Sequence, residues 1–97
     1  MRVISRKVLR SFPVEHADAK SQLESWFHEA RAADWKTSGD VKQQYPSASI
    51  VGSDRVVFDI CGNKYRLVTR MNYQCRIVYI RFLGTHADYD RIDAQEI

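Results

Sequence analysis

Three residues near the C-terminus of this 97-residue chain have the side chains needed for proton transfer: His86, Tyr89 and Asp90, in the stretch YIRFLGTHADYDRI. Thr85 is a residue type that caps helices, so a helical turn is predicted to begin at His86. Residues at i, i+3 and i+4 lie on one side of such a turn. Histidine transfers protons near neutral pH, and tyrosine can hydrogen-bond, stack or donate a proton. Asp90 would orient His86 or favour the helix dipole. The alternative is a purely structural turn whose Tyr89 packs on a sheet.

Basic residues are concentrated just before this segment. Residues 1–40 are nearly balanced, with seven Lys/Arg against six Asp/Glu. Residues 55–81 hold six basic side chains against a single acid, Asp59. The six are Arg55, Lys64, Arg66, Arg70, Arg76 and Arg81. A local surplus of this kind predicts a surface that binds a polyanion, although a solvated basic sheet face would look the same.

The elements that must position these residues are strands, because the hydrophobic period changes to two from Arg55 onward. We predict strands over 55–60, 64–72 and 76–83. The pair Gly62-Asn63 predicts a tight hairpin turn, because both residues tolerate positive φ. Residues 72–75 supply the second turn. Together the three strands form an antiparallel meander.

Alternation along these strands assigns the side chains to two faces of the sheet. Val78, Ile80 and Phe82 are expected to point toward the helices, whereas Ile77, Tyr79, Arg81 and Leu83 point away. The face away from the helices therefore collects Arg66, Arg70, Tyr79 and Arg81. Guanidinium groups beside an aromatic ring suit phosphates and stacked bases.

Helical periodicity occupies the first half of the chain. Residues 2–4 are a short strand that joins the edge of the meander. Ser5 is expected to cap a brief helix that ends near Pro13, and residues 17–33 form the main helix with an apolar stripe. A short helix is predicted from Gly39 to Tyr45, followed by a loop over 47–54. The fold class is thus α+β, in the order β-α-α-β-β-β, with the N-terminal helices packed on one face of the meander in a single domain, 1–97.

Composition excludes several classes of protein. An apolar fraction of 44% argues against disorder. The N-terminus is too charged for a signal peptide, and no apolar run is long enough to span a membrane. Cys61 and Cys75 have no CxxC spacing and should lie at opposite ends of the sheet, so we expect free thiols and no metal site. We expect a cytoplasmic protein that needs no cofactor.

The chain resembles the HigB-type toxins of bacterial type II toxin-antitoxin modules, within the RelE/ParE toxin superfamily. The resemblance covers nearly the whole sequence, and its most specific parts are GNKYRLV (62–68) and YIRFLGTHADYD (79–90). It implies a RelE/ParE-like fold and the activity of an mRNA interferase, an endoribonuclease that cuts translated mRNA on the ribosome. It also implies neutralisation by a HigA-type helix-turn-helix antitoxin.

The residues fit that chemistry, because RNA carries its own nucleophile in the 2′-hydroxyl. A metal-independent ribonuclease then needs an acid, a base and cations around the phosphorus. We expect His86 to transfer protons, with Tyr89 sharing this work or stacking a base; which group is acid and which is base stays open. Arg66 and Arg81 are expected to stabilise transition-state charge. Lys64, Arg70, Arg76 and Tyr79 are expected to bind the RNA.

One departure from the family pattern concerns the site. The lysine-rich, histidine-poor sites of RelE proper do not map onto this sequence. Because fold alone does not assign catalysis, a non-enzymatic toxin of the same fold, such as a ParE-like gyrase poison, or an RNA-binding protein is the alternative function. The feature that favours catalysis is the pair His86 and Tyr89 beside Arg66 and Arg81, because a pure binding surface has no need of it.

Overall fold

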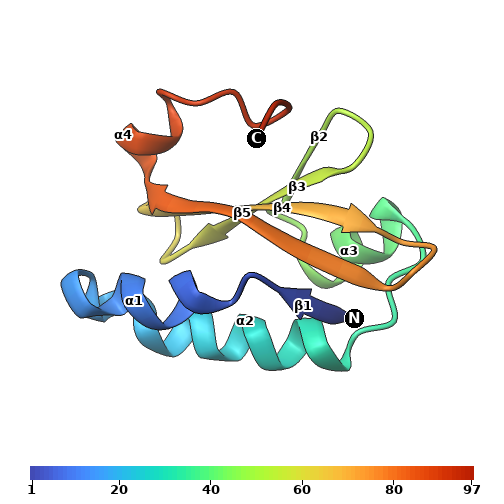
Figure 1. Ribbon diagram of the computed structural model, residues 1–97, viewed down its shortest axis with the longest axis horizontal. Coiled ribbons are helices and arrows are strands. Elements are labelled where there is room, and N and C mark those ends of the chain that lie inside the picture. Colours follow the sequence, from blue (N-terminus) through green and yellow to red (C-terminus); the bar gives the residue numbers. More distant parts are fainter.

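The computed structural model describes residues 1–97 and contains one mixed five-stranded sheet with helices against it (Figure 1). The strand order is β1-β5-β4-β3-β2; β1 pairs parallel with β5 and the other pairs are antiparallel. The elements are β1 (Arg2–Ile4), α1 (Lys7–Glu15), a 3₁₀ turn (Ala17–Ala19), α2 (Lys20–Ala32), α3 (Ser38–Gln44), β2 (Ser49–Val51), β3 (Arg55–Ile60), β4 (Tyr65–Asn72), β5 (Ile77–Thr85) and α4 (His86–Tyr89). The predicted α+β class, the meander and the edge position of the first strand are confirmed.

Helices α1 and α2 cover one face of the sheet (Figure 1). Leu23, Trp26 and Ala30 of α2 are buried in a core of 17 residues that includes Val56, Phe58 and Ile60 of β3 among its sheet members. These positions follow helical spacing on one side and strand alternation on the other, as the sequence predicts.

The predicted ends of α1 are wrong. Ser5 has φ 68° and Arg6 stands at the N-cap position with no side-chain cap, so the helix begins at Lys7. The helix also continues past Pro13 to Glu15. A proline inside a helix removes one N–H donor and disturbs the preceding turn, a cost that surrounding structure can outweigh. Here α1 packs with Val8, Leu9 and Phe12 against the core.

The predicted short helix is confirmed as α3, and the cap that starts it is Thr37. The Thr37 Oγ1 accepts a hydrogen bond from the Asp40 N–H, and the Asp40 carboxylate accepts one from the Thr37 N–H. The loop predicted after it is partly wrong, because residues 49–51 form β2 at the edge of the sheet. This strand is three residues long and largely exposed, so it carries no alternating pattern.

Both turns of the meander differ from the prediction by about one residue. Ile60 pairs with Tyr65, which leaves a four-residue loop over 61–64. Cys61 and Gly62 have the positive φ values, 54° and 67°, and Asn63 does not. In the second turn Asn72 pairs with Ile77, so the loop is 73–76.

A β-bulge at Arg81 changes the faces of the residues after it. Val68 of β4 pairs with Phe82, but Thr69 pairs with Ile80, so Arg81 is an extra residue in β5. An inserted residue shifts the alternation by one. Leu83 therefore belongs to the core under the helices and Phe82 to the opposite face, the reverse of the prediction. The face opposite α1 and α2 is called the outer face from here on.

Half of the outer face is covered by the C-terminal segment, residues 90–97, which runs above the sheet in Figure 1. Val57 and Val68 are 1% and 0% exposed because Ala94, Ile92 and Ile97 pack over them. Below the segment, the buried Arg55 donates from Nε to the Ile97 main-chain oxygen at 2.8 Å. The accessible side chains of the outer face are therefore those beyond the segment, namely the exposed Arg70 on β4 and Arg81 on β5 and the partly exposed Tyr79. None of the helices has both the length and the apolar character needed to cross a bilayer.

Candidate active site

The turn that carries the histidine is fixed by a complete capping box. The Thr85 Oγ1 accepts a hydrogen bond from the Asp88 N–H at 3.1 Å, and the Asp88 carboxylate accepts from the Thr85 N–H at 3.4 Å. The helix start is therefore capped by Thr85 and Asp88, as the sequence predicts for Thr85. The His86 N–H donates to the Lys64 main-chain oxygen at 3.1 Å, which ties the turn to the β3–β4 loop.

His86 and Asp90 form a pair across this turn. Their Nδ1 and Oδ2 atoms lie 3.1 Å apart, and both side chains are about half exposed, at 44% and 60%. A carboxylate only accepts hydrogen bonds, so Nδ1 is the donor and Nε2 is left facing other partners. Of the two roles considered for Asp90, the structure supports orientation of His86.

Tyr89 lies on the outer face under Arg66. The guanidinium carbon of Arg66 is 5.8 Å from the centre of the Tyr89 ring, a cation–π distance. Tyr89 also packs against the small cluster formed by Val57, Val68 and Ala94. The alternative prediction, that Tyr89 packs on the sheet, is thus confirmed, and the same ring also lies beside the Arg66 guanidinium.

Arg66 is held on several sides. It pairs with Asp59 at 3.1 Å across the β3–β4 hairpin, and it also bonds the main chain and side chain of Asn63. Its side chain is only 13% exposed. The contact of Arg66 with Asp59 was not predicted, and Asn63 was expected only as a turn residue. The pairing with Asp59 could have been predicted, because Asp59 is the single acid in residues 55–81 and lies across the hairpin from Arg66.

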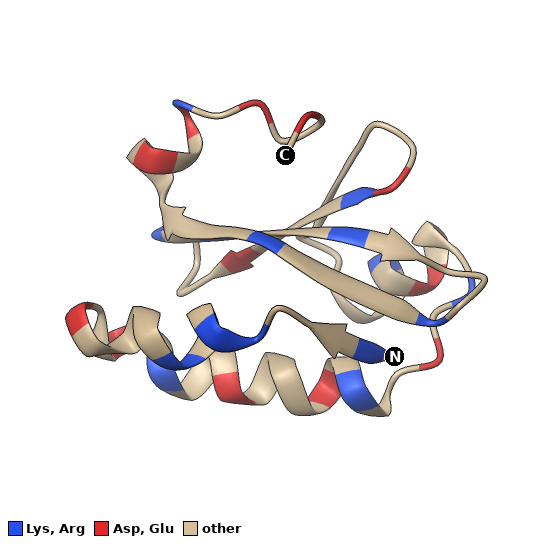
Figure 2. Ribbon diagram, in the orientation of Figure 1, with Lys and Arg blue, Asp and Glu red and all other residues tan.

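Arg81, Arg70 and Tyr79 occupy the open half of the outer face, where they line one shallow depression. Arg70 and Tyr79 are cross-strand partners. Arg70 pairs with Asp54 at 3.1 Å. Arg81 is exposed and takes part in no ion pair or side-chain hydrogen bond. Figure 2 shows basic positions on β4 and β5 across from acidic ones on α4 and the C-terminal segment.

Two predicted RNA-binding residues lie apart from this group. Arg76 sits in the β4–β5 loop and pairs with Asp34 at 2.6 Å. Lys64 pairs with Asp18 on the helix side of the sheet. The structure does not bring either side chain together with His86 and Tyr89.

Lys64, Asp18 and Tyr65 form a charged clamp between the 3₁₀ turn and the β3–β4 hairpin. Tyr65 donates its hydroxyl hydrogen to Asp18 at 2.6 Å. Hydrogen bonds from Lys64 and then Tyr65 lower the pKa of Asp18. The same bond to Asp18 raises the pKa of Lys64 and that of Tyr65. Because His86 is bonded to the main chain of Lys64, the clamp lies one hydrogen bond from the histidine turn.

The arrangement joins an oriented imidazole, a phenol and guanidinium groups at the rim of one basic face. Such a group can move protons and stabilise negative charge on a phosphate. No three His, Cys, Asp or Glu side chains converge in a way that could hold a metal ion. The two thiols, Cys61 and Cys75, are free and lie in the two different loops of the meander.

Residues 19–92 match the model of the HigB_toxin family, described as the RelE-like toxic component of a toxin-antitoxin system. The match begins at Ala19, the last residue of the 3₁₀ turn, and covers α2, α3, every strand from β2 to β5, and α4. No curated protein matches the chain.

Proposed function

The chain belongs to the family of HigB-type, RelE-like toxins, and on this premise we propose that it is an mRNA interferase. As a toxin of a toxin-antitoxin system it has an antitoxin as partner. The proposal adds that it cuts translated mRNA in the cytoplasm, on the ribosome, and so stops growth. The observation that carries the proposal is the His86–Asp90 pair at the rim of the outer face, with Arg66 over Tyr89 and the unpaired Arg81 on the same face.

The proposed reaction uses the 2′-hydroxyl of the RNA as nucleophile. Its oxygen attacks the adjacent phosphorus while one group takes its proton; the bond to the 5′-oxygen breaks, and a second group gives that oxygen a proton. The products are a 2′,3′-cyclic phosphate and a 5′-hydroxyl. His86 supplies one of the two proton transfers through Nε2, and Tyr89 is the candidate for the other.

The cations have different parts in this proposal. Arg81 is exposed and unpaired, so its guanidinium is available for the charge that builds on the phosphate oxygens. Arg66 is already bonded to Asp59 and Asn63, so we assign it chiefly to holding Tyr89 and adding positive potential. Arg70 and Tyr79 bind the RNA backbone and a base on the open half of the face. The contacts of Lys64 and Arg76 favour structural roles.

The test is cleavage by the purified toxin on programmed ribosomes, with the ends mapped along the mRNA. We expect cuts inside the translated region, products that end in a 2′,3′-cyclic phosphate, and resistance of an mRNA carrying a 2′-deoxy nucleotide at the cut. Cleavage of the deoxy substrate would reject the 2′-hydroxyl mechanism. Intact mRNA together with inhibited gyrase supercoiling would favour the ParE-like alternative.

A further inference from the structure

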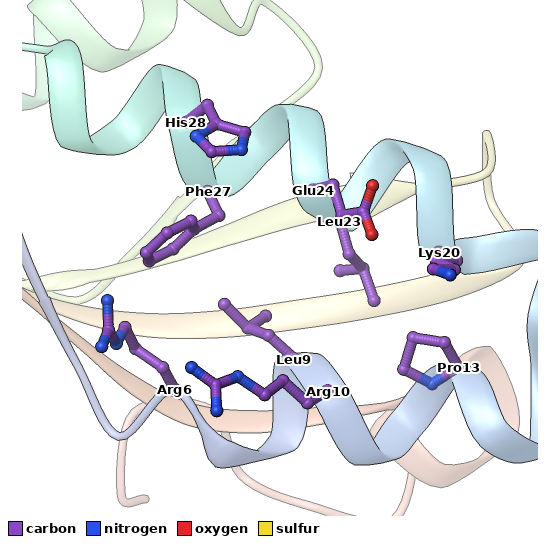
Figure 3. Close-up of a pocket in the computed structure, with 9 residues that line it drawn as sticks. All are labelled: Arg6, Leu9, Arg10, Pro13, Lys20, Leu23, Glu24, Phe27 and His28. Atoms are coloured by element: carbon purple, nitrogen blue, oxygen red, sulfur yellow. The ribbon is translucent and has the colours of Figure 1, made fainter.

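A groove runs between α1 and α2, in the helix layer (Figure 3). Its volume is about 330 Å³, and its apolar lining is Leu9, Pro13, Leu23 and Phe27. The sheet separates this layer from α4 and the C-terminal segment (Figure 1). The groove therefore belongs to the side of the molecule that the proposed reaction does not use.

The rim of the groove is basic. Arg6, at the N-cap position of α1, and Arg10, within α1, lie on the side of Leu9, and Lys20 lies on α2 near Pro13 (Figure 3). None of these three takes part in any ion pair of the chain, although five other basic side chains do so with Asp residues. The one acid on the rim is Glu24. Exposed cations around an apolar floor are complementary to a partner that offers both acidic and aliphatic side chains.

The lining favours a peptide over a nucleic acid. Single-stranded RNA binds basic surfaces through aromatic rings on which bases stack. Two rings line the groove: Phe27 already has the guanidinium groups of Arg6 and Arg31 within 5.1 and 5.6 Å of its centre, and the His28 ring lies edge-on to Phe27 at 5.7 Å. The rest of the floor is aliphatic.

We propose that this groove binds an acidic amphipathic helix of the antitoxin. Such a helix would place apolar residues of one stripe against Leu9, Leu23 and Phe27 and its carboxylates against Arg6, Arg10 and Lys20. The inference depends on membership of the toxin family, and so on the existence of an antitoxin, but not on the chemistry proposed for His86. An antitoxin bound by this groove would leave His86 and Arg81 uncovered.

The test is a charge reversal on the rim, Arg10→Glu with Lys20→Glu, matched by Arg2→Glu with Lys36→Glu, two exposed cations outside the groove. Both double variants should melt like the wild type and arrest growth when expressed alone. Co-expression with the antitoxin of the same module should rescue cells carrying the control but not the rim variant. Purified rim variant should bind that antitoxin at least about tenfold more weakly.

Each other result overturns the inference. If the antitoxin fully rescues cells carrying the rim variant, it binds elsewhere. If it fails to rescue cells carrying either double variant, antitoxin binding depends on the total charge of the toxin and not on the groove. If the rim variant no longer arrests growth while the control does, the groove is a contact with the ribosome or RNA. Hydrogen exchange on the wild-type complex gives a readout without mutation: we expect protection in residues 6–28, and protection confined to 79–90 would contradict the proposal. Loss of growth arrest in the wild type would instead count against the toxin function itself.

Discussion

At the scale of single residues, the candidate site separates side chains that are held from those that are free. Asp90 fixes one nitrogen of His86, and Asp59 with Asn63 fixes Arg66. Arg81 has no such partner, and it is the extra residue of a β-bulge, a feature that often redirects a side chain beside an active site. Arg81 is thus the arginine of the outer face whose guanidinium has no ion pair, which makes it the one most available to a phosphate.

The first prediction concerns His86→Ala and Arg81→Ala. Each should lower the rate of mRNA cleavage about a hundredfold or more, because each removes a group that acts on the reacting phosphate. Both side chains are solvent-accessible, so the melting temperature should change little. Cleavage mapping and a thermal melt check the two parts, with Arg76→Ala as the control that keeps activity. Wild-type cleavage by His86→Ala would mean that the turn is structural.

The second prediction concerns Asp18→Asn in the charged clamp. Because Lys64 and Tyr65 lower the pKa of Asp18 below its ordinary value of 3.8, the carboxylate stabilises the fold above that pH, and this contribution is lost as the pH falls through the lowered pKa. The variant should therefore melt below the wild type at pH 7, and the difference should shrink at about pH 2.5. Melting curves at the two pH values measure this; equal stability at pH 7 would rule out a contribution of the clamp.

At the scale of elements, the corner between β5 and α4 depends on a residue without a side chain. A Cβ on Gly84 would lie 2.6 Å from Cζ of Phe82 and 3.2 Å from Cβ of Asp88. Phe82 packs in the outer-face cluster and Asp88 completes the capping box, so neither can move without disturbing what it supports. The glycine therefore lets the histidine turn approach the sheet.

The third prediction compares two glycines. Gly84→Ala should cost about 1–3 kcal/mol through overpacking and should also reduce cleavage, since it displaces the turn that carries His86. Gly39→Ala, inside α3, meets only Thr37 Oγ1 at 3.5 Å and should gain about 0.5–1 kcal/mol. Denaturant unfolding measures both changes: the free energy of unfolding should fall for Gly84→Ala and rise for Gly39→Ala. A stable and active Gly84→Ala protein would show that the corner can relax.

Elements with strong local signals were predictable from the sequence. The strands over 55–83 and the stripe of α2 follow simple periods, Thr85 marks the start of α4, and Gly39-Asp40 predicts α3 one residue after its actual start at Ser38. Features that depend on tertiary packing were not: the three-residue β2, the bulge at Arg81 and the continuation of α1 through Pro13. The bulge matters most for the site, because one extra residue exchanged the faces of Phe82 and Leu83.

At the scale of the whole molecule, the chain has three layers: helices, sheet and C-terminal segment (Figure 1). The position of the basic residues on one face was predictable from strand alternation, but the packing of residues 90–97 over part of that face was not. Ile92, Ala94 and Ile97 are too widely spaced and too few to predict their docking on Val57 and Val68. The consequence is that the polyanion surface is limited to Arg70, Tyr79 and Arg81 with the adjoining rim.

The last prediction uses the salt dependence of RNA binding to count the cations on that surface. For single strands, each phosphate contact contributes about −0.7 to the slope of log K against log salt concentration. Arg81→Ala should therefore reduce the slope for a non-cleavable 2′-O-methyl oligonucleotide by about 0.7. Arg76→Ala should leave the slope unchanged, because Arg76 pairs with Asp34 in the β4–β5 loop. Fluorescence anisotropy at several salt concentrations measures both slopes. If Arg76→Ala reduced the slope and Arg81→Ala did not, the RNA would lie along the loop end of the sheet, away from His86.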